Sequence, residues 1–491
     1  MKRGRLGDRV ALGWLLAGGI GLAFGQGHAP IGVAALVGAI CMVRFFRASS
    51  ALPAFIGFVV AHVLVWETAY RGMVPLPWGA RLGMETGVSV LLAFVFLLDR
   101  WATRRSRSLL TTLVLPCGWV AFEFLSARLS PGGTWGSVAY SFVDDLVVAQ
   151  AASLFGWVTI TFLVAWIASA VNRAWDLGAP AWQRGLVGVG LVVVAVLAYG
   201  TVRLLPADQA DTARVACIVA PSTFDDEHIN DVWAYTRGVE APAESTERAI
   251  ARIEASIDEH FALAEHAAAT GARMVLWPEA GVTLTSAEET RLIARAGEVA
   301  RAHDLYLGLG LFIFRPETRE PSINKFVLVE PSGVIAIDFI KATRPPGAGH
   351  VVGDGVLPLL ESPLGAVSTA ICFDLDFPHL VGQAGRTGAD LFLAPSNDWS
   401  EARATHARMA RMRSIEQGFA LVRPTRDGVT IFTDGKGRVL ASLTLDDRQT
   451  GTLVADVPTR GHRTLYAAIG DAFSWACSVA LVAVCVFLRR R

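Results

Sequence analysis

The sequence predicts a membrane protein with two kinds of domain, a multi-pass α-helical membrane domain and a soluble α/β domain. The 491 residues are 53% hydrophobic and 18% charged, which is too apolar for an ordinary soluble protein and long enough for at least two domains. Long apolar runs fill residues 10–204 and 467–488. Between them, strand-like and helix-like patterns alternate in a segment with the charge density of a soluble domain.

The apolar runs set the expected domain boundaries. We expect an N-terminal transmembrane domain of about seven helices at 1–205, an extracytoplasmic domain at 206–465, and a C-terminal transmembrane helix with a basic tail at 466–491. A helix needs roughly 20 apolar residues to cross a bilayer. Eight runs come near this length, at about 9–26, 30–46, 51–69, 84–99, 109–127, 147–171, 185–204 and 467–488.

The arginines predict how the chain is oriented in the membrane. Cytoplasmic loops are enriched in Lys and Arg. With the N-terminus inside, the inside loops hold most of the arginines in the membrane half, namely Arg44, Arg47, Arg100, Arg104, Arg105, Arg107, Arg173, Arg184 and residues 489–491. The soluble domain would then lie outside the cytoplasmic membrane and act on an extracytoplasmic substrate. The formal net charge is zero, and the sequence contains no block of basic residues that would predict a nucleic-acid partner.

The soluble segment is expected to form a layered α/β sandwich. Short apolar runs predict strands, and apolar residues spaced by three and four predict helices. The expected strands are at 213–220, 274–277, 305–314, 325–330, 334–340, 367–371, 391–394 and 420–424, and the expected helices at 243–270, 286–303, 380–387 and 401–418. A last hairpin is expected around the turn at 433–437.

Glu279, Lys341 and Cys372 each stand just after an apolar run that predicts a strand. A thiolate is the nucleophilic form of cysteine, a carboxylate can take the thiol proton, and an ammonium can stabilise a thiolate or an oxyanion. Taken singly, each has a simpler interpretation, a buried core cysteine or a surface salt-bridge partner. Together at strand ends, they predict a site with Cys372 as nucleophile, Glu279 as base and Lys341 as cation.

The motifs around these residues resemble the nitrilase superfamily of carbon-nitrogen hydrolases. WPEA includes Glu279 and ICFD includes Cys372, with the strand-end lysine between them. Because membrane segments flank the soluble domain, the chain is similar to the apolipoprotein N-acyltransferase family in particular. The resemblance implies a nitrilase-type αββα sandwich, catalytic Glu279, Lys341 and Cys372, no cofactor and no metal.

The same resemblance implies substrates and a location. The acyl donor would be a phospholipid of the bilayer, whose acyl chain passes to Cys372 as a thioester while Lys341 and the Phe373 N–H hold the oxyanion. The acceptor would be the N-terminal α-amine of a diacylated lipoprotein. The protein would lie in the cytoplasmic (inner) membrane with its catalytic domain facing the periplasm or the cell exterior.

Further residues are expected to support the site. Asn397, Trp399 and Glu416 belong to a segment that is similar to the family's segment after the nucleophile, and we expect them to build the pocket and support the sheet. The alternative for the helix at 401–418 is a solvated charged face, which we favour more for Arg411 than for Glu416.

Two positions depart from the family pattern. The family carries a glutamate in the loop after its lysine, whereas this chain has His350 near that place and Asp354 further on. The sequence leaves open which of them, if either, replaces the lost acid. Asp374 stands where the family usually has glutamate and is expected to serve as a shorter acid. A metal at His350 is not predicted, because no second ligand stands at helical or hairpin spacing.

The altered loop keeps two other functions open. One is a membrane-tethered nitrilase-type amidase, or another acyltransferase that uses the same residues with a different acceptor. The other is a non-catalytic membrane partner protein, which would require Glu279, Lys341 and Cys372 to be inactive. We favour the lipid-using acyltransferase because all three residues are present.

Overall fold

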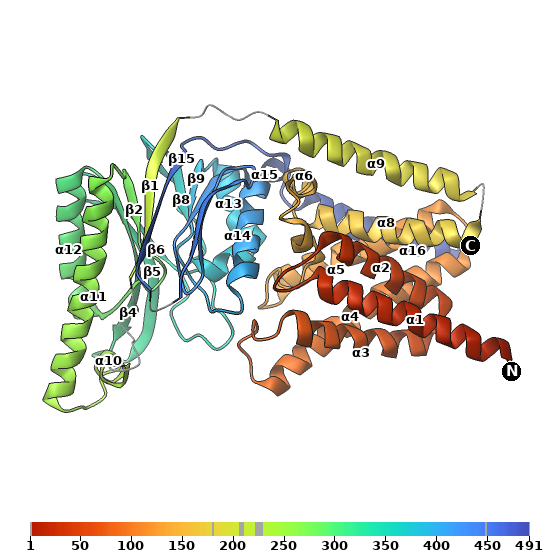
Figure 1. Ribbon diagram of the computed structural model, residues 1–491, viewed down its shortest axis with the longest axis horizontal. Helices are drawn as coiled ribbons and strands as arrows, with labels where there is room; N and C mark the ends of the chain where they lie inside the picture. The colour runs from red at the N-terminus through yellow and green to blue at the C-terminus, as the bar shows by residue number, and fades with distance from the viewer. Residues whose placement is uncertain (1, 179–180, 206–210, 221–228, 447–448, 491) are drawn as a thin grey trace. The chain divides into compact units, whose positions relative to one another are not determined.

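Two compact units make up the chain. The computed structural model describes residues 2–178, 181–205, 211–220, 229–446 and 449–490. One unit comprises Met1–Ala207 with Ala468–Arg491, and the other comprises Asp208–Ala467. The first unit is built from helices, and the second from β-sheets flanked by helices (Figure 1).

Long apolar helices form the first unit. They are α1 (Lys2–Gly25), α2 (Gly32–Ala48), α3 (Ala51–Ala69), α4 (Trp78–Arg105), α5 (Val114–Leu129), α8 (Val158–Leu177), α9 (Ala181–Leu204) and α16 (Ala472–Arg490). Within the described ranges, six stretches are long and apolar enough to cross a membrane, namely α3, α4, Leu109–Leu129, α8, Leu186–Leu204 and α16. The predicted multi-pass helical membrane domain is therefore confirmed.

The structure corrects the span expected at 147–171. The chain there forms two short helices, α6 (Leu146–Ala149) and α7 (Ala152–Phe155), before α8 begins at Val158. Gly156 ends α7 with a φ of 82°, a left-handed conformation that glycine adopts without steric cost. The residues around this break are apolar, so hydropathy does not reveal it. The expected span was therefore wrong at its start, because the membrane helix α8 begins only at Val158.

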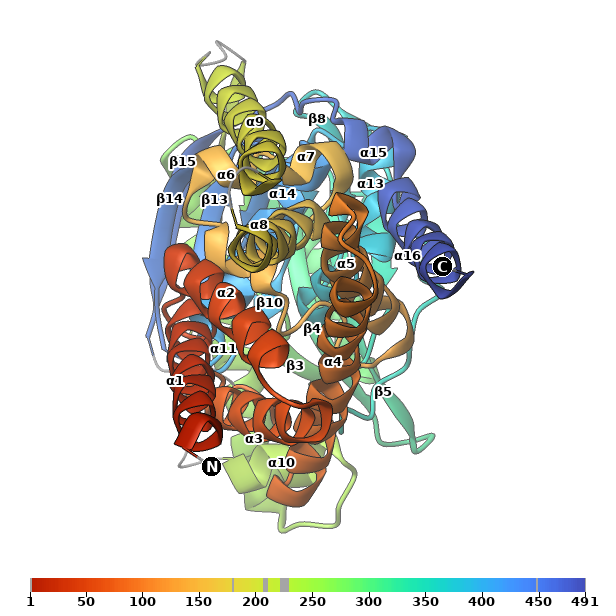
Figure 2. The same cartoon turned by 90° about the vertical axis from the view of Figure 1, so that its right-hand side faces the viewer.

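Small residues let α1 and α2 approach each other closely. A Cβ added to Gly21 would lie 2.7 Å from the Cα of Gly38. Glycines at such positions allow two membrane helices to pack backbone against backbone. Figure 2 looks along the helices and shows α8 and α5 between α2 and α16, in agreement with the contacts of these helices.

Glu123, an acid in the middle of α5, joins three segments of the helical unit. Its carboxylate accepts hydrogen bonds from Trp119 Nε1 (3.1 Å), Ser137 Oγ (2.7 Å), Thr161 Oγ1 (2.7 Å) and Val138 N (3.3 Å). The donors come from α5 itself, from α8 and from the connection between α5 and α6. Because its acceptor sites are used by the protein, this carboxylate serves as a packing contact within the membrane domain.

Two large sheets and a short one form the second unit. The first has the strand order β15-β1-β2-β4-β5-β6 with β3 beside β4, the second has the order β14-β13-β11-β9-β8-β7, and β10 pairs with β12. The strands are β1 (Thr212–Val219), β2 (Met274–Leu276), β3 (Val282–Thr285), β4 (Tyr306–Arg315), β5 (Glu320–Val329), β6 (Ile335–Ile340), β7 (Leu360–Ser362), β8 (Gly365–Thr369), β9 (Leu391–Leu393), β10 (Ser396–Asn397), β11 (Ala420–Arg423), β12 (Thr425–Arg426), β13 (Val429–Thr433), β14 (Val439–Thr444) and β15 (Gly451–Pro458).

Helices cover the outer face of each large sheet. α11 (Ala243–Ala269) and α12 (Ser286–His303) pack on the first sheet, and α13 (Pro378–Thr387) and α14 (Arg403–Gln417) pack on the second (Figure 1). One hydrophobic cluster lies between the two sheets and another lies between the first sheet and its helices. The layers run helix, sheet, sheet, helix, so the predicted αββα sandwich is confirmed.

Strand β1 shows why the buried strands have continuous apolar sequences. Val215 and Cys217 belong to the cluster between the sheets, while Ala216 and Ile218 belong to the cluster beneath the helices. Successive side chains of a strand point to opposite faces, and here both faces are buried. Cys217 is accordingly a core residue.

Several described elements were not predicted, among them β3, β7, β15 and α10 (Ile229–Thr236). Of these, β15 pairs antiparallel with β1 over its whole length, from Thr212↔Pro458 to Val219↔Gly451. This pairing places the first and last strands of the unit side by side at one edge of the first sheet.

Candidate active site

The ends of three strands position the acid, the lysine and the cysteine. β2 ends three residues before Glu279, β6 ends directly before Lys341, and β8 ends shortly before Cys372, which begins a 3-10 turn. A strand fixes the backbone direction, while the residue beyond its end can turn its side chain into a site. The structure brings all three predicted residues together: Lys341 pairs with Glu279, and both charges lie close enough to act on the Cys372 thiol.

Glu279 and Lys341 form a buried ion pair. The Lys341 Nζ lies 2.5 Å from Glu279 Oε1, and the two residues are 2% and 5% exposed. Asn324 on β5 donates a second hydrogen bond to the same oxygen from Nδ2, at 2.7 Å. Burial by itself would raise the pKa of Glu279, but the Lys341 charge and these hydrogen bonds hold it below its usual value. Glu279 is therefore ionised at neutral pH and available as a base.

Cys372 is held in a strained conformation at the start of its turn. Its φ is 50°, in the left-handed region that few non-glycine residues occupy. Its N–H donates to the Pro395 carbonyl at 3.0 Å, and its Sγ lies 3.6 Å from the Asn397 carbonyl oxygen. Burial and the Glu279 carboxylate raise the pKa of the thiol, while Lys341 and a nearby histidine oppose that rise. The resting cysteine is a thiol beside a carboxylate that can accept its proton.

Asp374 supports the turn from within. One of its oxygens accepts the N–H groups of Ile371 (3.0 Å) and Ala342 (3.3 Å), and the other accepts the Thr343 hydroxyl (2.6 Å). Asp374 thereby joins the chain after Lys341 to the chain at Cys372. Burial raises the pKa of this carboxyl to about 6, against the lowering effect of Lys341 and the hydrogen bonds.

The loop after Lys341 holds His350 and Asp354, the two candidates to replace the family's loop glutamate, and they have very different surroundings. His350 is buried, and its Nε2 lies 3.2 Å from the Thr343 carbonyl oxygen. Burial and the charge of Lys341 lower the pKa of His350, so the ring is neutral at neutral pH. Asp354 is exposed, and its carboxylate accepts the N–H of Val356 within its own loop. Of the two, the structure brings His350 near the ion pair.

The remaining predicted residues have different surroundings. Phe373 is buried and packs edge-on against Phe377, with the ring centroids 5.4 Å apart. Asn397 contributes its carbonyl to the Cys372 sulfur, and Trp399 is partly buried just before α14. Glu416 is fully buried at the end of α14, where its Oε2 lies 3.1 Å from the Arg413 Nε. This ion pair supports the helix rather than the sulfur.

The alternative considered for α14, a solvated charged face favoured mainly for Arg411, was wrong. Arg411 is only 8% exposed and donates from Nε to the Gly437 carbonyl at 2.6 Å. Arg413 is completely buried beside Glu416. Charged side chains can enter a core where carbonyls or opposite charges replace water. The one-letter pattern of α14 carries no sign of these partners.

A cluster of charged residues beside Cys372 was not predicted. His406 in α14 places Nδ1 2.6 Å from Asp398 Oδ1 and Nε2 3.2 Å from Asp376 Oδ1. The Nη2 of Arg423 lies 2.9 Å from each oxygen of Asp398. Asp376 follows Cys372 within its turn, and Asp398 follows Asn397, so proximity to motif residues was the available signal.

The donor atoms of Cys372, Asp398 and His406 all lie within 4.8 Å of one another. Three such donors can hold a metal ion in some proteins. Here Asp398 already binds the guanidinium of Arg423 through both oxygens. A metal ion would have to displace or face that fixed positive charge, so this donor set does not suit a cation.

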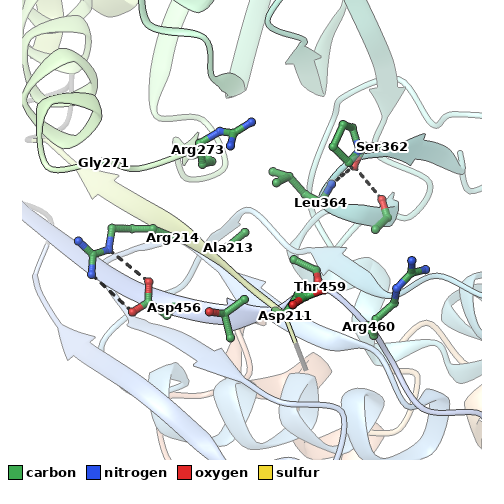
Figure 3. A pocket seen from close by; sticks show the side chains of 13 residues that line it. Asp211, Ala213, Arg214, Gly271, Arg273, Ser362, Leu364, Asp456, Thr459 and Arg460 are labelled. Carbon is green, nitrogen blue, oxygen red and sulfur yellow. Dashed lines mark hydrogen bonds and ion pairs between the residues drawn. The ribbon is translucent and has the colours of Figure 1, made fainter. Parts of the chain in front are cut away.

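A separate cavity opens at the opposite ends of the strands. Its volume is about 550 Å³, and its walls include Ala213 near the start of β1 and Leu364 just before β8 (Figure 3). Arg214 on β1 and Asp456 on β15 form an ion pair in its wall, with Nε 3.2 Å from Oδ1 (Figure 3). None of the strand-end residues described above lines this cavity, so it is distinct from the site around Cys372.

Comparison with protein families agrees with the division of the chain. Residues 236–464 match the carbon-nitrogen hydrolase family, and residues 17–170 match the N-terminal domain of apolipoprotein N-acyltransferases. The fold and the matched families define a membrane-bound enzyme whose soluble domain is of the carbon-nitrogen hydrolase class.

Individual relatives extend the similarity over most of the chain. An apolipoprotein N-acyltransferase of Geobacter metallireducens is 25% identical over 476 residues, which cover 89% of this chain and 87% of the relative. One from Bradyrhizobium diazoefficiens is 27% identical over 485 residues, covering 88% and 81%. The chain is thus similar to apolipoprotein N-acyltransferases over most of its length. Among solved structures, it is similar to an amidase from Nesterenkonia sp., with 19% identity and a TM-score of 0.43 over 55% of this chain and 97% of the amidase.

Proposed function

We propose that the protein transfers an acyl chain from a phospholipid, through a thioester on Cys372, to the N-terminal α-amine of diacylglyceryl-cysteine in lipoproteins. The observation that carries the proposal is the buried Glu279–Lys341 pair beside the cysteine, in a chain that also has helices able to span a bilayer. A lipid substrate can reach a membrane-embedded enzyme laterally from the bilayer. We further propose that the membrane is the cytoplasmic (inner) membrane and that the catalytic domain faces outward.

In the first half of the reaction, Glu279 takes the proton of Cys372 and the sulfur attacks an ester carbonyl of the phospholipid. The charge that develops on the carbonyl oxygen is stabilised by the ammonium of Lys341 and the N–H of Phe373. When the tetrahedral intermediate collapses, Glu279 gives its proton to the departing alkoxide. The products are a lysophospholipid and an acyl thioester on Cys372.

In the second half, the α-amine of the lipoprotein attacks the thioester carbonyl. Glu279 takes a proton from the amine, and the carbon–sulfur bond breaks with its electron pair passing to sulfur. Protonation of the sulfur by Glu279 regenerates the thiol and leaves an amide on the acceptor. The same carboxylate thus acts as base and then as acid in each half-reaction.

Acylation of the enzyme can be tested with a phospholipid that carries a radioactive acyl chain. The full-length protein in detergent should retain label that hydroxylamine releases, as expected for a thioester. Cys372→Ala should retain none, whereas Cys217→Ala, which removes a core cysteine of the same unit, should still be labelled. Undiminished label in the Cys372→Ala variant would refute the thioester.

The acceptor can be tested by intact-mass spectrometry of a lipoprotein from a strain that lacks this protein. Restoring the protein should add the mass of one amide-linked acyl chain at the N-terminal cysteine. No added mass, despite a labelled enzyme, would refute the lipoprotein as acceptor. Hydrolysis of a small amide by the purified protein without lipid would then favour a membrane-tethered amidase.

A further inference from the structure

His406 is a buried histidine that the proposed reaction does not use. It lies in the first turn of α14 and is 2% exposed. Its ring lies close to the nucleophile, since one donor atom each from His406, Asp398 and Cys372 fall within 4.8 Å of one another. Because α14 packs against the turn that begins with Cys372, the position of the ring is fixed by the fold.

Both ring nitrogens of His406 face a carboxylate. Asp398 Oδ1 lies 2.6 Å from Nδ1, and Asp376 Oδ1 lies 3.2 Å from Nε2. A neutral ring has a single N–H and could turn a proton toward only one of these carboxylates, whereas the imidazolium turns one toward each. Burial would lower the pKa of His406, but the two acids raise it well above its ordinary value. The ring is an imidazolium at neutral pH.

The charges around the cluster balance. Arg423 also binds Asp398, and its Nη2 approaches the ring Nδ1 to 3.2 Å because both groups use the same carboxylate. Asp376 and Asp398 supply two negative charges, and His406 and Arg423 supply two positive charges. The imidazolium is the member of this cluster that lowers the pKa of the Cys372 thiol through both its charge and a hydrogen bond.

Cys372 therefore has a cation on each of two separate elements. Lys341 follows β6 but is closely paired with Glu279, and His406 belongs to α14. We propose that His406 is a further catalytic residue, an imidazolium that stabilises the sulfur of Cys372 when it carries negative charge. This inference rests on the proposed role of Cys372 as nucleophile.

The imidazolium would act at two points of the reaction. When Glu279 removes the thiol proton, His406 stabilises the thiolate before its sulfur bonds to the acyl carbon. When the carbon–sulfur bond of the thioester breaks, the electron pair returns to sulfur and His406 stabilises that leaving group until Glu279 protonates it. His406 keeps its own protons throughout, so no additional reactant is required.

The test is the pH dependence of Cys372 alkylation by iodoacetamide in the full-length protein in detergent. Alkylation at this cysteine is followed by peptide mass spectrometry between pH 6 and 10. His406→Gln should move the midpoint of the rate profile upward by at least about one pH unit, and so slow alkylation roughly tenfold at neutral pH. His406→Lys, which keeps a positive charge, should restore a large part of that shift.

A control separates charge from packing. Ser414→Ala alters another fully buried polar residue of α14, which bonds to Thr433 and carries no charge. It should leave the alkylation midpoint unchanged. If His406→Gln leaves the midpoint unchanged, or if the Gln and Lys substitutions shift it equally, the proposed role of the positive charge is overturned.

A second measurement needs no substitution and so does not depend on whether the variants fold. In protein labelled with ¹⁵N-histidine, exposed histidines are neutral at pH 8.5, well above their ordinary pKa of about 6.5. A solid-state NMR signal of an imidazolium should persist there, and its absence would overturn the proposal. Because neither experiment uses lipid or amine, a shifted alkylation midpoint without acyl transfer would refute the proposed function while supporting this inference.

Discussion

The Glu279 carboxylate and the Lys341 ammonium lie 2.5 Å apart in a site that excludes water from both. Each charge makes the other tolerable in the interior, since an isolated buried ion loses several kcal/mol of solvation. The pair thus keeps an ionised base next to Cys372. It also holds a cation, Lys341, whose positive charge is no longer neutralised once Glu279 accepts a proton. Stability and catalysis consequently respond differently when the pair is broken.

Replacing only Lys341 by Met should destabilise the soluble domain by about 3–5 kcal/mol, because Glu279 is left as an uncompensated buried charge. The pKa of Glu279 should rise, so that the base is protonated near neutral pH and acylation is lost. Thermal unfolding in detergent and labelling with radioactive phospholipid measure the two effects.

The double substitution Glu279→Gln with Lys341→Met removes both charges and provides the control. It should recover most of the lost thermal stability while remaining inactive. If Lys341→Met alone proves as stable as the unsubstituted protein, the ion pair is not the structural element described above.

Asn324 should affect the pH dependence of acylation rather than its maximum rate. Its Nδ2 donates to Glu279 Oε1 at 2.7 Å and helps to hold the pKa of the acid down. Asn324→Ala should therefore raise that pKa and move the acidic limb of the single-turnover acylation profile to higher pH. Activity should approach the unsubstituted value at pH 8–9, whereas an equal loss at every pH would argue for misplaced geometry instead.

The candidate site residues that could be predicted are those whose position follows from strand patterns. Glu279, Lys341 and Cys372 each follow a run of apolar residues, and a run of that kind fixes where a strand ends. Asn324 and His406 could not be placed in this way. One lies within a strand and the other within a helix, and only the packing of distant elements brings them to the site.

The buried charges of α14 escaped prediction for a related reason. Arg413 and Arg411 look like residues of a solvated face, because a sequence shows charge but not the Glu416 carboxylate or the Gly437 carbonyl that receives it. The broken helix before α8 has a different cause. Its apolar composition suits a membrane span, and the interruption depends on the backbone conformation of Gly156.

Asp304 offers a way to stabilise the soluble domain without touching the site. It ends α12 with a φ of 49° and a ψ of 48°, a left-handed conformation that glycine adopts more easily. Its negative charge also lies at the unfavourable end of the helix dipole. Asp304→Gly should raise the unfolding free energy by about 0.5–1 kcal/mol with unchanged acylation, while Asp304→Ala should give a lower melting temperature than Asp304→Gly.

The raised pKa of Asp374 should make the free energy of unfolding depend on pH in a defined direction. Its folded pKa of about 6 lies above the ordinary value for aspartate, so the fold favours the protonated carboxyl. The contribution of this group to the free energy of unfolding is fully present below the ordinary pKa and is lost as the pH rises through 6. Lowering the pH from 7.5 to 4.5 should therefore stabilise the unsubstituted protein relative to a variant that cannot take up this proton.

Asp374→Asn is that variant, and comparison with the unsubstituted protein cancels the other titrating groups that the two share. The amide has one acceptor oxygen where the carboxylate has two, so it cannot accept from both the Ile371 and Ala342 N–H groups on one side and the Thr343 hydroxyl on the other, and the variant should be less stable at every pH. The difference in melting temperature should widen as the pH falls toward 4.5, because only the aspartate gains from protonation. A difference that is constant or that narrows on acidification would show that Asp374 does not titrate near pH 6 in the folded protein.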